Sequence, residues 1–402
     1  MRSTVELPDG PIEIDDARWS ELTADIDHRK PLPRLAYAAA HVVMDSSYQR
    51  IQHSVDRPGS AEEIAEHVDW DATMQLRTVI GREGFGIAEA MDTAQRFNLG
   101  WNAARELIER TGKLGLSAGF CAGASTDHLP QVTTTNDLVH GVTEQIQVIR
   151  SAGGVPVILP MPLLCELKLG ASAFTDVYGE IIRNAGDGPL VIHWLGPMFL
   201  PALEGYFPGD SFRRIMRIDP SRVRAAKLSM LDHALEVELR RDLLERDQIM
   251  MTGDDFHFGA LIAGESNDIT STDRTTELDG RKVDLGDFSH ALLGILDAIA
   301  SPAALAMRHL DNGNRSAYDT IMNPCEKLGQ VIFEAPTRHY KTGLAFLAWI
   351  NGIQDNPMLV NHEESCRTPE HLCRVVRLAN DAGAIGNAPL ATERLAGWAA
   401  DL

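Results

Sequence analysis

Short apolar runs recur along residues 34–302, and most of them alternate with segments that have the pattern of amphipathic helices. The first run, Leu35–Met44, is nearly wholly apolar, which is typical of a parallel strand covered on both faces. Alternating strands and helices predict an α/β fold, a (β/α)8 TIM barrel in one domain. We expect the eight strands at Leu35–Met44, Phe85–Met91, Leu114–Cys121, Val155–Pro160, Leu190–Leu195, Val223–Leu228, Gln248–Met251 and Ala291–Leu296.

The segments on either side of this repeat have different patterns. Residues 1–33 are polar, with prolines near both ends, and we expect them to form an N-terminal extension. Residues 303–402 show helical periodicity only, which predicts a C-terminal helical extension packed on the barrel. A polar insertion at 264–286 precedes the last strand. The pattern leaves open whether this insertion is a lid or a subunit contact.

Charge and cysteine content narrow the function classes. The formal net charge of −20 argues against a nucleic-acid or anionic membrane partner, because phosphate groups would be repelled. The five cysteines are scattered and form no Cys-x-x-Cys pair, so neither a disulfide framework nor a zinc site is expected. No apolar run approaches the roughly 20 residues of a membrane span, and residues 1–16 lack the apolar core of a signal peptide. We expect a cytoplasmic protein.

Lys227 is the second-to-last residue of the expected strand Val223–Leu228. A lysine buried in a barrel is costly to desolvate unless it has a partner or a chemical role. Burial lowers the pKa of an amine, so that part of it is neutral and nucleophilic near pH 7. Such an amine attacks a ketone or aldehyde and forms an imine. The alternative is a structural lysine paired with a carboxylate at the barrel rim.

His193 and Trp194 end an earlier strand. Strand alternation places their side chains on opposite faces, so that only one points into the barrel. We expect His193 to move protons, because imidazole titrates near neutral pH. Trp194 is predicted to form a wall of the substrate site. The alternative for His193 is a core histidine bonded to a backbone carbonyl.

A second polar cluster, Glu89, Asp92 and Arg96, begins at the second strand. The planar fork of Arg96 suits a carboxylate or a phosphate, and the two acids could orient hydroxyl groups of the substrate. The alternative is local helix chemistry, in which Asp92 caps a helix and pairs with Arg96 four residues later.

Asp254, Asp255 and His257 follow the seventh strand and are predicted to bind substrate at the rim. With Asp127, His128, His193 and Glu89 they include enough nitrogen and oxygen ligands for a divalent metal. No fixed-spacing metal motif is present, and turn formation is the other interpretation of Asp254 and Asp255. Because no dinucleotide fingerprint or phosphate-binding loop occurs, we expect no cofactor. No residue is assigned as a metal ligand, and the sequence leaves open whether a divalent metal binds.

Several segments resemble the dihydrodipicolinate synthase / N-acetylneuraminate lyase superfamily of class I aldolases. Ile192–Pro197 is similar to a strand that ends in an aromatic residue before a proline, and Ala225–Ser229 to the strand that carries the imine lysine. Thr252–Asp255 is similar to the strand that ends in Gly-Asp-Asp. The helical region after residue 302, with Tyr340–Ala345, resembles the family's trailing segment. The resemblance implies that Lys227 is the imine lysine and that the protein is a homo-oligomer.

The chain also departs from that family. The Gly-Thr-Thr-Gly-Glu-like loop that holds a pyruvate carboxylate is replaced by residues 86–96, and His193 or Trp194 stands in place of the tyrosine that shuttles protons. The sequence therefore predicts a Schiff-base lyase or aldolase for a small keto acid or keto-sugar. The alternatives are a metal-dependent sugar isomerase or epimerase, with Glu89, His193, Asp255 and His257 as ligands, and a non-catalytic binding protein on the same fold.

Overall fold

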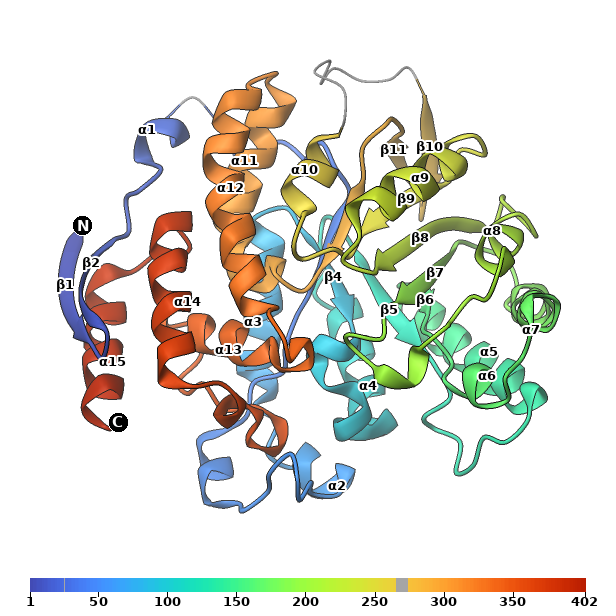
Figure 1. Ribbon diagram of the computed structural model, residues 1–402, viewed down its shortest axis with the longest axis horizontal. Helices are drawn as coiled ribbons and strands as arrows, with labels where there is room; N and C mark the ends of the chain where they lie inside the picture. Colours follow the sequence, from blue (N-terminus) through green and yellow to red (C-terminus); the bar gives the residue numbers. More distant parts are fainter. Residues whose placement is uncertain (25, 265–273) are drawn as a thin grey trace.

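The computed structural model describes residues 1–24, 26–264 and 274–402 (Figure 1). Eight parallel strands form a closed barrel in the order β12-β3-β4-β5-β6-β7-β8-β9, which confirms the predicted (β/α)8 TIM barrel. The strands are β3 (Ala36–Ala39), β4 (Gly86–Glu89), β5 (Phe120–Ala124), β6 (Val155–Ile158), β7 (Leu190–Leu195), β8 (Val223–Ser229), β9 (Ile249–Thr252) and β12 (His290–Leu293).

Helices connect the strands on the outside of the barrel, and aspartate or threonine side chains cap several of them at their N-termini. Asp69, Thr134 and Asp232 accept hydrogen bonds from the first turns of α3, α5 and α9. The main helices are α3 (Trp70–Arg82), α4 (Arg96–Gly112), α5 (Thr135–Ser151), α7 (Ala171–Asn184), α8 (Ser211–Met216), α9 (His233–Leu244), α10 (Phe258–Ala263) and α11 (Leu296–Asp311). Shorter turns are α1 (Ser20–Thr23), α2 (Ala61–Ala65), α6 (Leu163–Glu166), η1 (Ser46–Arg50), η2 (Asp92–Ala94) and η3 (Pro201–Leu203).

The third strand begins later than predicted. The pattern placed it at Leu114–Cys121, whereas β5 spans Phe120–Ala124. Gly115 and Gly119 both have a φ of 63°, which is left-handed backbone that interrupts an extended strand. Residues 114–119 therefore form turns that lead into the barrel.

Strand alternation divides the apolar residues into two layers. On β7, Val191 packs inside the barrel, whereas Leu190 and Ile192 pack outside it against the helices. The hairpin of β10 (Thr275–Leu278) and β11 (Arg281–Asp284) belongs to the predicted insertion, and its Leu278 and Val283 join the interior layer. Residues 265–273 of that insertion lie outside the described residues.

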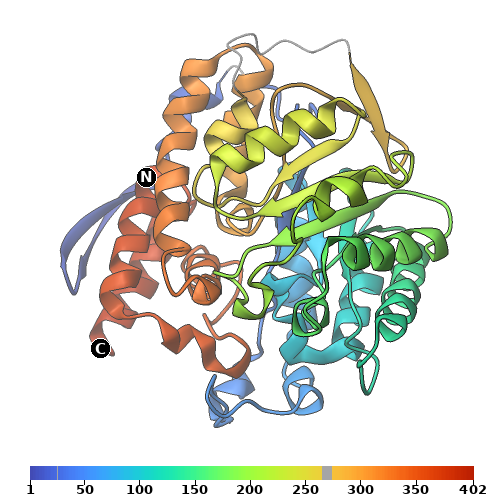
Figure 2. The same ribbon diagram turned by 45° about the vertical axis from the view of Figure 1, so that its right-hand side comes forward.

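The two ends of the chain pack together beside the barrel (Figure 1). An antiparallel hairpin, β1 (Arg2–Leu7) and β2 (Gly10–Asp15), lies against the C-terminal helices, so the N-terminal extension has regular structure. The orange and red helices gather on one side of the barrel in the turned view of Figure 2 as well, which agrees with the predicted helical extension. They comprise α12 (Arg315–Ile332), η4 (Thr337–His339), α13 (Lys341–Ile350), η5 (Val360–Cys366), α14 (Pro369–Ala382) and α15 (Ala388–Ala400).

The boundary predicted at residue 302 falls inside α11, three residues after a kink at Ile299, so the same helix belongs to both the barrel and the extension. Within the described ranges, no helix has both the length and the apolar character that a bilayer crossing requires.

Candidate active site

A cavity of about 440 Å³ opens at the carboxyl ends of the barrel strands, where the sites of this fold form. Residues in the last part of, or shortly after, seven of the eight strands line it, together with two aromatic residues of the C-terminal extension. The polar lining consists of Asp92, Thr93, Ser125, Thr126, Asp127, His193, Lys227, Ser229, Asp255 and Tyr340. The apolar wall includes Met91, Phe97, Leu159, Leu195, Phe199, Leu200, Leu203 and Phe333.

Lys227 lies in this cavity, with only 8% of its surface exposed. Within the described residues, its amine has no hydrogen-bond or ion-pair partner, so it is not the carboxylate-paired lysine of the structural alternative. Gly253 on the neighbouring segment makes room for it, because a Cβ at that position would lie 2.9 Å from the Lys227 Cε. The side chain therefore reaches the cavity through a gap that any larger residue at 253 would fill.

Burial sets the electrostatics of the site. It lowers the pKa of the Lys227 amine, and the negative charge of Asp255 opposes this only in part. Burial also raises the pKa of the Asp255 carboxyl. The backbone N–H of Ile295, which donates to the Asp255 Oδ1 at 3.0 Å, lowers that pKa but does not offset the effect of burial. Since both shifts favour neutral forms, the amine and the acid are brought close to the pH range in which proton transfer is useful.

His193 is paired in register with Lys227 on the adjacent strand, so both side chains enter the barrel from neighbouring positions. Its Nε2 lies 3.3 Å from the Ser229 Oγ, and its Nδ1 has no partner among the described residues. Burial, with the charge of Lys227, lowers the pKa of His193 well below its ordinary value. The ring is neutral at pH 7, and it is bonded to no backbone carbonyl of the described residues.

Trp194 points away from the cavity, to the outside of the barrel. Its ring packs against Phe207 and Phe212, with centroid distances of 5.3 and 5.0 Å. Alternation was correctly predicted to separate it from His193, but the same alternation removes Trp194 from the substrate wall.

The rim cluster after β9 divides in the same way. Asp255 lines the cavity, whereas Asp254 is buried in the turn and accepts the backbone N–H groups of Phe256 and His257. His257 bonds to Asp254 through its Nδ1 at 2.8 Å and lies outside the cavity. Of the two aspartates, Asp254 thus follows the turn interpretation and Asp255 does not.

Glu89 is fully buried but does not reach the cavity. Its two carboxylate oxygens accept hydrogen bonds from Arg77 at 2.6 and 2.8 Å, and Thr111 donates a third at 2.6 Å. The side chain therefore joins β4 to α3 and α4 in a buried ion pair, and it is not free to orient a substrate.

Arg96 is also withdrawn from the substrate. It is buried and donates to Asp127 at 2.7 and 3.1 Å, to Gln145 and to the carbonyl of Gly123. With its donors in use, Arg96 positions Asp127 in the cavity lining. It does not pair with Asp92, although the helix interpretation predicted that pair. Of the predicted cluster, only Asp92 lines the cavity.

Tyr340 enters the cavity from the C-terminal extension, and sequence reasoning did not select it. Its hydroxyl lies 2.8 Å from the Thr93 Oγ1 and donates to the Asp92 carboxylate at 3.0 Å. Its ring stacks on Phe333 with a centroid distance of 4.3 Å. Burial raises the pKa of Tyr340 well above its ordinary value, so the phenol keeps its proton. The similarity of Tyr340–Ala345 to an aldolase segment was the only sequence signal nearby.

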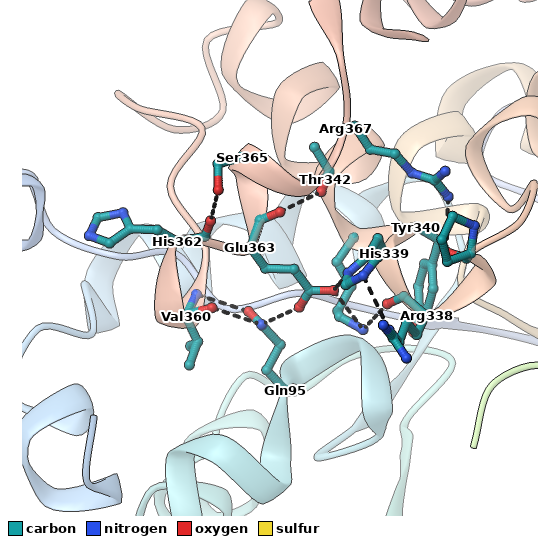
Figure 3. A network of polar contacts seen from close by, with 12 residues as sticks. Gln95, Arg338, His339, Tyr340, Thr342, Val360, His362, Glu363, Ser365 and Arg367 are labelled. Carbon is teal, nitrogen blue, oxygen red and sulfur yellow. Dashed lines mark hydrogen bonds and ion pairs between the residues drawn. The ribbon is translucent and has the colours of Figure 1, made fainter. Parts of the chain in front are cut away.

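A polar network holds this segment of the extension against Gln95, the N-cap residue of α4 (Figure 3). The Glu363 carboxylate accepts a hydrogen bond from Gln95 at 2.7 Å and lies 3.0 Å from the His339 Nδ1. The backbone carbonyl of Glu363 accepts a hydrogen bond from the Thr342 hydroxyl. Gln95 also exchanges two hydrogen bonds with the backbone of Val360. Because His339 and Thr342 flank Tyr340 in sequence, the network fixes the position of the phenol at the cavity.

A metal centre is not assembled by the predicted ligands. Glu89 is bonded to Arg77 and His257 to Asp254, so neither accompanies His193 and Asp255 in the cavity. In the part of the chain that the structure describes, no group of three or more His, Cys, Asp or Glu side chains is arranged to hold a metal ion.

The family comparison matches residues 5–400 to the model described as "Protein of unknown function (DUF993)". The chain belongs to this family. No curated protein matches it.

Solved structures show the same fold as this DUF993 chain at low sequence identity. Dihydrodipicolinate synthase from Oceanobacillus iheyensis has a TM-score of 0.57 and 11% identity, with 90% of this chain and 98% of that chain covered. The corresponding synthase from Bacteroides thetaiotaomicron gives 0.58 and 12%, with 87% and 99% covered. N-acetylneuraminate lyase from Mycoplasma synoviae gives 0.55 and 10%, with 87% and 98% covered. The resemblance seen in the sequence is confirmed for the fold.

Proposed function

We propose that the protein is a class I aldolase-like lyase in which Lys227 forms a Schiff base with a small keto acid or keto-sugar. The observation that carries this proposal is the state of Lys227: a buried amine at the end of β8, without a partner among the described residues, facing a cavity. A buried arginine could not serve, because only the lysine amine loses its proton on burial. The likeness in fold to dihydrodipicolinate synthase and N-acetylneuraminate lyase supports the same proposal.

Imine formation joins the Lys227 nitrogen to the carbonyl carbon of the substrate. The neutral amine attacks, the carbonyl oxygen takes up protons and leaves as water, and a carbon–nitrogen double bond remains. Asp255 is suited to supply a proton to the leaving oxygen, because burial keeps part of its carboxyl protonated. In the protonated imine, the nitrogen accepts the electron pair of a neighbouring carbon–carbon bond as that bond breaks.

Two groups in the cavity can move the protons of that step. His193 is neutral and adjacent to Lys227, which suits a base. Tyr340 is a protonated phenol that donates to Asp92, and the Thr93 hydroxyl lies within hydrogen-bonding distance of it. We assign Tyr340 the role of acid and His193 that of base, so that the proton shuttle has one member from the barrel and one from the C-terminal extension.

Borohydride trapping tests the proposal. The protein is incubated with pyruvate, other small 2-keto acids and keto-sugars, reduced, and analysed as intact chain and as peptides by mass spectrometry. An adduct on Lys227 is expected, with a mass that names the substrate class. Lys327→Ala, a change at an exposed lysine, should retain the adduct, and Lys227→Ala should lose it. Absence of any adduct across the panel would overturn the aldolase assignment.

A further inference from the structure

A second cavity, of about 510 Å³, lies at the opposite end of the barrel. Its walls come from the segments that lead into β3, β4, β5 and β12, together with the β10–β11 hairpin. The barrel separates it from Lys227, and the proposed lyase reaction makes no use of it.

The lining of this second cavity reverses the charge balance of the chain. Seven of its twenty lining residues are arginine or lysine, and one, Asp284, is acidic. In the whole chain, 57 acidic residues outnumber 37 basic ones. A concentration of positive charge in a hollow of an acidic protein indicates an anionic ligand.

Two of these cations are buried without a carboxylate. Arg308 and Arg34 are 5% and 6% exposed, and neither forms an ion pair with any described residue. The Arg308 Nη2 donates to the carbonyls of His28 and Glu83 at 2.9 Å, and the Arg34 Nε donates to the carbonyl of Ile262 at 3.2 Å. The Nε and Nη1 of Arg308 have no partner among the described residues.

An unneutralised guanidinium is costly to bury, and a bound anion would offset that cost. Arg34 remains charged at neutral pH, since burial lowers its pKa only to about 10. Arg82, at the end of α3, and Lys282, in the β10–β11 hairpin, add two exposed cations to the lining, and no ion pair within the described ranges involves either.

We propose that this cavity binds a small molecule that carries a phosphate or diphosphate group. Guanidinium forks match phosphate oxygens in pairs, and several cations converging on one hollow favour a multiply charged anion over a single carboxylate. A nucleic acid fits the rest of the surface poorly, because the net charge of −20 would repel its backbone.

Calorimetric titration of the full chain with pyrophosphate, at fixed ionic strength, tests this proposal. One equivalent should bind. The double variant Arg82→Glu/Lys282→Glu should weaken the affinity by at least about tenfold, because two attractive charges become repulsive. The matched control Arg183→Glu/Lys327→Glu makes the same change of net charge at exposed positions on α7 and α12, and it should leave the affinity unchanged.

Further arms separate this cavity from the catalytic one. Lys227→Ala should bind pyrophosphate as the wild type does. If it does not, the anion occupies the other cavity and the proposal fails. No binding by the wild type at millimolar pyrophosphate, or equal weakening in the control variant, would also overturn it. Equally tight binding of sulfate and citrate would reject the assignment to phosphate. None of these results depends on whether Lys227 forms an imine.

Discussion

Among the described residues, the buried cation without an ion pair in the C-terminal cavity is a lysine, whereas those in the N-terminal cavity are arginines. Lys227 shares its cavity with a neutral His193 and with Asp255, whose pKa is raised. Arg34 and Arg308 are bonded to backbone carbonyls and keep their charge. Burial can take the proton from an amine but not from a guanidinium. One end of the same barrel is therefore suited to proton transfer and covalent chemistry, and the other to holding an anion.

The largest effect is expected when Lys227 is replaced by arginine, the residue type of the buried cations in the other cavity. Lys227→Arg keeps the positive charge and removes the nucleophile, so imine trapping should fall by at least about 10³-fold. Trapping is followed by peptide mass spectrometry with the carbonyl compound that labels the wild type. Lys327→Arg, at an exposed position, is the control. Labelling of Lys227→Arg at the wild-type rate would mean that another residue is the nucleophile.

Glu89 provides a buried charge that, unlike those of Lys227, Arg34 and Arg308, has an ion-pair partner, Arg77. Glu89→Ala should lower the free energy of unfolding by about 3–5 kcal/mol, since it leaves the Arg77 guanidinium buried and unpaired. Urea denaturation measures this change. Glu109→Ala removes an exposed pair with Arg105 and should cost less than about 1 kcal/mol.

Borohydride trapping tests whether Glu89 also takes part in imine formation. At a temperature at which the Glu89→Ala variant remains folded, it should be labelled at Lys227 as the wild type is. A stable variant that fails to label would return Glu89 to the site.

Tyr340 tests whether the C-terminal extension takes part in the chemistry of that cavity. Tyr340→Phe should slow proton exchange at the carbon next to the carbonyl by about 10²-fold, because the acid of the shuttle is removed. Exchange is followed by NMR in D2O with a carbonyl compound that traps on Lys227. Tyr318→Phe removes a buried hydroxyl that donates to the carbonyl of Gly259, away from the cavity, and is the matched control. Equal exchange rates in both variants would assign Tyr340 a packing role.

The barrel and the inward lysine were predictable because both depend on local pattern. Apolar strands alternating with helices specify the barrel. The period of two along a strand separates His193 from Trp194, and register then places His193 beside Lys227. The third strand was misplaced because glycines that adopt left-handed turns, such as Gly115, also occur in apolar runs.

The remaining site residues were not predictable because their partners are distant in the sequence. Arg77 and Glu89 lie on different elements, so no helical spacing connects them. Arg96 pairs with Asp127, 31 residues away, and not with Asp92 at i+4. Tyr340 meets Thr93 across 247 residues, because the extension folds back over the end of β4. The polar type of a side chain indicates that it needs a partner, but only tertiary packing decides which.

The pH dependence of trapping is the smallest effect and the most direct test of the difference between the two ends. Burial lowers the pKa of Lys227 to about 8, whereas an ordinary lysine titrates near about 10.4. Because the neutral amine is the attacking form, the trapping rate should rise with pH and level off above about pH 8. Samples are incubated at each pH and quenched into borohydride at one common pH, so that reduction does not vary.

Asp255→Asn should move this midpoint to lower pH, since the aspartate charge is what raises the pKa of the amine against burial. Asp187→Asn, at an exposed position, should leave the midpoint in place. A rate that still climbs steeply between pH 9 and 10 would mean that Lys227 is not desolvated. The distinction between a lysine that gives up its proton and arginines that keep theirs would then no longer separate the two ends of the barrel.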